Sequence, residues 1–248
     1  MKVLIVCRPR TRSTLLIDAL SKYHNLEDKD ENYKFCFGKV HFGIVNDDMY
    51  YNLFMGYIKT ATQNNFKQDN FAIKLYPRMM TFSQHKINNL DDYQLKIIPN
   101  LTYFTNIRKY DKVYFLTRNL VDSICSWAYG NHINYYNFRD HETLISKTST
   151  MPNLTIDLDN DPELKFYILE SAILDVWKKF LDDHISHTTL DYYDLPNYVS
   201  TTYPNIVNKT IDSKLDYTKI ITNYSDLENK INNYYKLCYA KVKDIPFR

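Results

Sequence analysis

The sequence predicts an α/β fold, in which a parallel central sheet is covered by helices on both faces. Two observations support this class. Short apolar runs alternate along the chain with segments of helical periodicity, which is typical of strand–helix–strand units. The runs also lack polar alternation, as expected for strands buried on both faces. No internal repeat or linker interrupts the pattern, so we expect one domain over residues 1–248.

Four apolar runs predict the strands of this sheet. They are Val3–Val6, Phe71–Tyr76, Lys112–Thr117 and Thr188–Tyr193. Apolar residues spaced three or four apart predict the helices. We expect these at about Ser13–Tyr23, Tyr50–Thr62, a broken helical region over 79–107, the segment after Arg118, Pro162 to about Asp183, a short helix or turn after Asp194, and Ser225 to about Lys243. Residues 24–47, 131–161 and 214–222 are expected to be largely irregular.

Composition predicts a soluble protein. Hydrophobic residues make up 44% of the chain and charged residues 24%, and no apolar run is long enough to span a membrane. A formal net charge of +2 argues against general nucleic-acid binding, although it allows a local cationic pocket. The sequence begins without a signal segment, and its four cysteines include no C-x-x-C pair. We therefore expect reduced thiols and a cytoplasmic location. The oligomeric state is left open.

A basic, hydroxyl-rich turn follows the first strand directly. It carries three arginines and three hydroxyl side chains: Arg8, Arg10, Arg12, Thr11, Ser13 and Thr14. Backbone N–H groups and the positive end of a helix dipole converge at such a strand-to-helix turn, so it suits a phosphate or sulfate. No glycine precedes Gly38, which excludes a Walker A loop. The alternative is an ordinary helix start capped by Ser13 or Thr14, with solvated arginines.

A second candidate anion site follows the strand Lys112–Thr117. Arg118 comes directly after this strand, and Ser126 lies about two turns along the helix that follows. An arginine fork at a strand end and a hydroxyl on the next helix are suited to phosphate binding. The alternative is a surface arginine and a small residue that allows close helix packing.

Together these motifs resemble the PAPS-dependent sulfotransferases, whose members share a P-loop NTPase-like α/β fold. The segment from Pro9 to Leu15, PRTRSTL, resembles the family's 5′-phosphosulfate loop, P-[KR]-S-G-[ST]-T followed by Trp or Leu. Arg118 and Ser126 resemble its 3′-phosphate pair. Tyr192-Tyr-Asp-Leu195 resembles its Y-E-D-L segment, in which the tyrosine lies near the nucleotide.

The resemblance implies transfer of a sulfuryl group from 3′-phosphoadenosine 5′-phosphosulfate (PAPS) by in-line displacement. The acceptor would be a hydroxyl or amine of a small molecule, saccharide or peptide, and adenosine 3′,5′-bisphosphate would be the product. In this comparison Arg10 contacts the bridging or sulfuryl oxygens, and Arg118 with Ser126 binds the 3′-phosphate. The rest of the donor site is Arg8, Pro9, Thr11, Arg12, Ser13, Thr14 and Tyr192. No H-E-x-x-H motif or acidic cluster of metal-ligand spacing occurs, so we expect no metal.

Three departures from the family pattern stand out. Arg12 replaces the usual glycine of the first loop, which would limit close approach of the backbone to a ligand. Leu15 replaces the tryptophan that many cytosolic members place against adenine. The R-K-G segment that those members carry near the C-terminus is not visible. The chain therefore resembles a bacterial or viral member, and a viral one would act in the host cytoplasm.

The catalytic base has two candidates in this sequence. Cytosolic members carry I-K-T-H where this chain reads Ile73-Lys-Leu-Tyr76, so Lys74 is kept but the histidine is not. His41 and Glu31, after the first helix, are the candidates, because several relatives place a glutamate in that segment. His41 could instead be a buried core histidine. Lys74 could be an edge-strand residue that faces water.

Two other functions remain open at this point. One is a nucleotide-dependent kinase of the same fold, although the chain lacks a Walker lysine and magnesium ligands. The other is a non-catalytic adenosine-bisphosphate or anion binder, in which Arg12 blocks the sulfuryl site.

Overall fold

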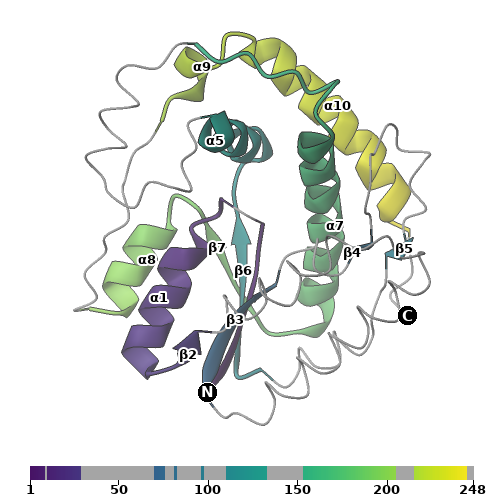
Figure 1. Ribbon diagram of the computed structural model, residues 1–248. Helices are drawn as coiled ribbons and strands as arrows, with labels where there is room; N and C mark the ends of the chain where they lie inside the picture. The colour runs from purple at the N-terminus through teal and green to yellow at the C-terminus, as the bar shows by residue number, and fades with distance from the viewer. Residues whose placement is uncertain are drawn as a thin grey trace, which may run out of the picture.

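The computed structural model describes residues 1–8, 10–28, 70–75, 81–82, 96–97, 110–132, 153–204 and 215–244. Within these residues strands alternate with helices, which confirms the α/β class (Figure 1). The helix expected over Tyr50–Thr62 lies outside them, as does most of the polar segment 131–161.

Five parallel strands form the central sheet in the order β2-β3-β1-β6-β7. Their bounds are β1 Lys2–Val6, β2 Glu27–Asp28, β3 Phe71–Leu75, β6 Lys112–Thr117 and β7 Thr188–Asp191. The central strand, β1, pairs with β3 on one side and β6 on the other, so that Val6 lies opposite both Leu75 and Phe115. Because the pairing is parallel, the residues that follow β1, β3 and β6 emerge at one edge of the sheet.

Helices cover both faces of this sheet, as the sequence predicts. On one face lie α1 (Ser13–His24) and α8 (Leu195–Thr202), and on the other lie α5 (Leu120–His132), α7 (Pro162–His184) and α10 (Tyr224–Val242) (Figure 1). The alternation of β1 side chains explains the two cores. Leu4 and Val6 pack with α7, whereas Val3, Ile5 and Cys7 pack with α1.

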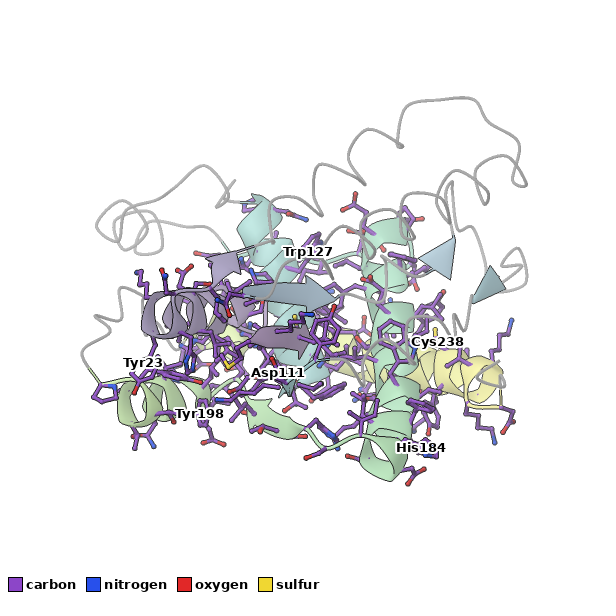
Figure 2. The ribbon with its side chains drawn as sticks, turned by 90° about the horizontal axis from the view of Figure 1, so that it is seen from below. Tyr23, Asp111, Trp127, His184, Tyr198 and Cys238 are labelled. Atoms are coloured by element: carbon purple, nitrogen blue, oxygen red, sulfur yellow. The ribbon has the colours of Figure 1, made fainter. Side chains whose placement is uncertain are left out.

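The longest helix, α7, forms the expected core stripe. Leu164, Ile168, Ala172 and Val176 are buried, and Phe180 packs against the same core. Trp127 on α5, labelled in Figure 2, lies against Tyr167 of α7 with 5.8 Å between ring centroids. Asp161 caps the helix, since its Oδ1 accepts from the N–H groups of Glu163 and Leu164 over 2.9 and 3.0 Å.

Tyrosines pack where α1 and α8 meet β6. The hydroxyls of Tyr114 and Tyr203 lie 3.1 Å apart, and the rings of Tyr23 and Tyr198 lie 5.1 and 6.2 Å from that of Tyr203 (Figure 2). Burial raises the pKa of Tyr203 to about 12, so this hydroxyl stays protonated at neutral pH. The cluster therefore serves packing.

Three short elements were not predicted. Residues 79–107 were expected to be mainly helical with breaks, but the described residues 81–82 and 96–97 are strands, β4 (Thr81–Phe82) and β5 (Lys96–Ile97), which form an antiparallel pair, and the rest of this range lies outside the described residues. Short apolar runs have no decisive period, and a strand partner 14 to 16 residues away overrides local preference. The segment 214–222 was expected to be irregular, but it contains α9 (Tyr217–Ile220), which Asp216 caps.

The described cysteines are Cys7, Cys125 and Cys238, and all three are buried and free of disulfides, as expected. Burial raises the pKa of both Cys125 and Cys238 to about 12, so their thiols are unreactive at neutral pH. In the part of the chain that the structure describes, no helix combines the length and apolar character needed to cross a bilayer.

The cap of α7 gives a stability prediction. Asp161→Ala should lower the free energy of unfolding by about 1 kcal/mol, because the N–H groups of Glu163 and Leu164 lose their acceptor. Urea unfolding followed by circular dichroism measures this change. Asp161→Asn, which keeps a side-chain oxygen, is the control and should stay close to the wild type. Equal losses in both variants would contradict a capping role.

Candidate functional site

The candidate site lies at the edge of the sheet where β1, β3 and β6 end. Arg8 follows β1, Lys74 is near the end of β3, and Arg118 follows β6. All three are buried, with exposed fractions of 7%, 2% and 7%. Adjacent parallel strands thus bring three cations to one place, which is where α/β proteins bind ligands.

Direct hydrogen bonds join the two sequence motifs. Arg8 donates from Nη2 to the carbonyl oxygen of Arg118. Arg118 in turn donates from Nη1 to the carbonyl oxygen of Arg10 over 2.8 Å. Each arginine therefore supports the backbone that carries the other motif, and the loop after β1 is fastened to the end of β6.

Arg10 links the first motif to α5. Its backbone is left-handed, with φ of 65°, and its Nε donates to Oγ of Ser126 over 3.1 Å. Ser126 is 5% exposed, so the accepting hydroxyl of this hydrogen bond is buried. The expected pair of Arg118 and Ser126 thus lies in one site, with Arg10 as the residue that connects them.

The start of α1 carries no side-chain cap. The N-cap is Arg12, whose backbone is left-handed (φ 60°, ψ 23°), and no side-chain hydrogen bond caps the helix. The alternative in which Ser13 or Thr14 caps α1 is therefore wrong. Both residues instead occupy the first helical positions, where their backbone N–H groups belong to the positive end of the helix dipole.

The side chain of Arg12 is directed toward Tyr192, in the turn after β7. Its Nη1 donates to the carbonyl oxygen of Tyr192 over 3.3 Å, and its Cζ lies 4.1 Å from the centroid of the tyrosine ring. Arg118 shares that ring, with Cζ 3.9 Å from the centroid. The backbone N–H of Tyr192 donates to the carbonyl oxygen of Thr117 over 2.9 Å, so the turn is held beside β6.

Two other predicted residues have contacts within the site. Thr11 is fully buried and donates from Oγ1 to the carbonyl oxygen of Arg8 over 2.8 Å, which braces the loop. Lys74 donates from Nζ to Oγ1 of Thr14 over 3.2 Å. The alternative of an edge-strand lysine is wrong, because β3 lies between β2 and β1.

Arg8 and Arg118 keep unused hydrogen-bond donors within the part of the chain that the structure describes. Within the described part of the chain, Arg8 and Arg118 form no ion pair, and the buried Nε of each has no hydrogen-bond partner. Buried cations without a counter-ion are costly. Binding of an anion at this edge would compensate that cost.

Neighbouring phenols remain neutral at physiological pH. Burial raises the pKa of Tyr167, against the opposing effect of the cations Arg8 and Arg118. Burial and a 2.9 Å hydrogen bond to Asp122 raise the pKa of Tyr193 to about 12. Neither phenol therefore carries a negative charge at neutral pH.

A cavity of about 270 Å³ adjoins the arginines on the α7 face of the sheet. Its polar lining comes from β1, β6, α7 and α10 and consists of Arg8, Thr117, Arg118, Asp175, Asn232 and Tyr235. The Tyr235 hydroxyl donates to Oδ2 of Asp175 over 2.5 Å, and burial raises the pKa of this tyrosine. The cavity thus lies directly beside Arg8 and Arg118, at the ends of β1 and β6.

Sequence reasoning missed the contact of Arg8 with Arg118 and the shared ring of Tyr192. A signal for the first was present, because Arg8 and Arg118 each come within two residues of the end of adjacent parallel strands and so emerge near each other. No comparable signal exists for Tyr192, whose contacts depend on the turn after β7. Pro9, Glu31 and His41 lie outside the described residues.

The arrangement suits recognition of a phosphate or sulfate ester. Guanidinium forks, a lysine, hydroxyls and an uncapped helix start are all donors that favour such anions. Among the residues that the structure describes, no group of three or more His, Cys, Asp or Glu could hold a metal ion. Comparison with protein-family models and with curated proteins found no match for this chain.

Proposed function

We propose that this chain is a PAPS-dependent sulfotransferase. One observation carries the proposal: the Arg118 guanidinium donates to the Arg10 carbonyl over 2.8 Å, which unites the two cationic motifs. PAPS carries anions at both its 5′ and its 3′ ends, so its binding requires two cationic centres within the length of one nucleotide. The proposal is supported by the position of the two motifs, which are 108 residues apart in sequence and lie together at one sheet edge.

The strand order supports a P-loop NTPase-like architecture. The strand that carries the anion loop, β1, is central and lies between β3 and β6. The loop after it leads into a helix whose N-cap residue, Arg12, makes no side-chain capping hydrogen bond. In this architecture the loop holds the 5′-phosphosulfate and the end of the neighbouring strand holds the 3′-phosphate.

We assign the donor contacts on this basis. Arg10 contacts the bridging or sulfuryl oxygens, and Ser13 and Thr14 hold the 5′-phosphate with the N–H groups of α1. Lys74 reaches the same region, since its Nζ lies 3.2 Å from Oγ1 of Thr14. Arg118 and Ser126 hold the 3′-phosphate. Arg8 fixes the backbone of Arg118 by donating a hydrogen bond to the Arg118 carbonyl oxygen.

The reaction requires an acceptor hydroxyl or amine to attack the sulfur atom in line. The bond between sulfur and the bridging phosphate oxygen breaks, and adenosine 3′,5′-bisphosphate leaves with that oxygen and its electron pair. A base takes the acceptor proton, for which His41 and Glu31 are the candidates. Arg10 and Lys74 stabilise the charge that develops on the bridging oxygen, as cations do in phosphoryl transfer.

The direction of the Arg12 side chain favours an enzyme over a blocked binder. Its guanidinium lies over the ring of Tyr192 and bonds to the tyrosine carbonyl. These contacts draw it toward the turn after β7 and away from the first turn of α1. A left-handed Arg12 thus takes the backbone conformation for which glycine is usually needed.

Nucleotide preference tests the proposal. Adenosine 3′,5′-bisphosphate should raise the melting temperature of the full chain more than ATP with magnesium, because only the bisphosphate fills both cationic centres. Differential scanning fluorimetry measures both shifts. If ATP with magnesium raises the melting temperature and the bisphosphate does not, the chain is not a sulfotransferase.

Arg118 tests the location of the 3′-phosphate. Arg118→Met should weaken bisphosphate binding by about tenfold or more, the effect of losing a charged hydrogen bond. Isothermal titration calorimetry measures the dissociation constant. Lys236→Met removes an exposed cation on α10 and is the matched control. Binding that survives Arg118→Met would move the 3′-phosphate elsewhere.

The base is tested by separating turnover from donor affinity. We test the two candidates with His41→Ala and Glu31→Ala. The variant that lacks the base should show a kcat about 100-fold lower, with an unchanged donor dissociation constant. Transfer of labelled sulfate to a panel of acceptors measures the rate. The exposed residues His132 and Glu228, each replaced by alanine, are the controls. Wild-type rates in both test variants would place the base at another residue.

A further inference from the structure

We propose that the cavity between β6, α7 and α10 is a binding pocket for a small amphoteric molecule. Such a molecule carries a carboxylate at one end and an amine or hydroxyl at the other, joined by a short hydrocarbon chain. The pocket is distinct from the donor site of the proposed function, although Arg8 and Arg118 belong to both. The inference goes beyond that function, because it concerns binding in the absence of any nucleotide.

The size and position of the cavity suit a small ligand. It lies where the end of β6 meets α7 and α10, two helices that run side by side (Figure 1). Its volume of about 270 Å³ is close to the lower limit of small-molecule pockets, about 300 Å³. The described residues that line it do not include the donor-site hydroxyls of Ser13, Thr14 and Ser126. The cavity is therefore a space of its own beside the anion loop.

The buried part of the lining is cationic. Arg8 and Arg118, each 7% exposed, both line the cavity. Arg8 uses one N–H group on the Arg118 carbonyl, and Arg118 uses one on the Arg10 carbonyl. A guanidinium has several N–H donors, so each arginine keeps some of them within the part of the chain described. Because the planar fork of a guanidinium matches a carboxylate, this wall suits the anionic end of a ligand.

The exposed part of the lining carries acceptors. Asp175 of α7 and Asn232 of α10 are exposed, and Tyr235 of α10 is half-buried, so a ligand can enter on this side. The Tyr235 hydroxyl donates to Oδ2 of Asp175, which leaves Oδ1 of the carboxylate available. This oxygen and the amide oxygen of Asn232 can both accept from an amine or a hydroxyl.

The rest of the lining favours a short hydrocarbon chain. Apart from Thr117 it is apolar, and it consists of Phe115, Leu116, Leu120 and Leu174. A ligand with only an anionic group would be attracted by the arginines but repelled by Asp175, and a ligand with only a cationic group would meet the reverse. A molecule that carries both groups is attracted at both ends.

Three four-carbon probes test this chemistry. 4-Aminobutanoate carries both groups, whereas butanoate carries only the carboxylate and butylamine only the ammonium. Each is titrated into the full chain without nucleotide, and NMR chemical shifts give the dissociation constants. We expect 4-aminobutanoate to bind at least about tenfold more tightly than either of the others. Equal affinities for the three probes, or no saturable binding of 4-aminobutanoate, would overturn the inference.

Asp175 tests the acceptor end. Asp175→Asn should weaken 4-aminobutanoate binding by about tenfold, because the ammonium loses a charged hydrogen bond. Butanoate should bind this variant at least as well as the wild type, since the repelling charge is gone. Asp183→Asn removes an exposed carboxylate of α7 that does not line the cavity and is the matched control. Equal effects of the two substitutions would contradict the proposed contact.

Asn232 tests the location. Asn232→Trp places a large side chain at the exposed part of the cavity and should abolish 4-aminobutanoate binding. Asn233→Trp, at the next exposed position of α10, is the control and should bind the probe as the wild type does. Binding that survives Asn232→Trp would place the ligand elsewhere and overturn the inference.

Adenosine 3′,5′-bisphosphate, titrated into the same variants, separates this inference from the proposed function. Asn232→Trp should keep its affinity for the bisphosphate, and loss of both ligands would make the cavity part of the nucleotide site. If the wild type binds the bisphosphate but not 4-aminobutanoate, only the inference fails. If it binds 4-aminobutanoate but not the bisphosphate, the inference holds and the sulfotransferase proposal fails.

Discussion

The site depends on the reciprocal contact between the ends of β1 and β6. Arg8 holds the Arg118 backbone, and Arg118 holds the Arg10 backbone. These bonds come from charged donors, and one is buried and the other partly buried, which places them among the stronger hydrogen bonds in proteins. They fix the path of the loop before α1 begins, so the positions of Arg12, Ser13 and Thr14 all follow from them.

The parallel sheet makes that contact possible. With β1 between β3 and β6, a residue that follows any of these strands emerges next to residues that follow its neighbours. The chain therefore assembles a cationic site from segments that are far apart in sequence. The result is a concentration of buried arginine and lysine side chains at one edge of the sheet.

Much of this arrangement could be predicted from local patterns. The run Val3–Val6 and the strand Lys112–Thr117 were found because unbroken apolar runs identify strands buried on both faces, and Pro162 marked the start of α7. The pair β4 and β5 was missed because its pairing is non-local. The direction of the Arg12 side chain was also beyond prediction, since it depends on the turn after β7, 180 residues away.

The loop between β1 and α1 contains two left-handed residues, Arg10 and Arg12, neither of which is a glycine. Glycine would give the unfolded chain more conformations to lose on folding, and it would leave a folded loop easier to deform. A loop held instead by arginine side chains is stiff only while their contacts persist. The rigidity of the loop therefore depends on tertiary contacts. A change at β6 or at the turn after β7 would loosen the loop, although both segments are far from it in sequence.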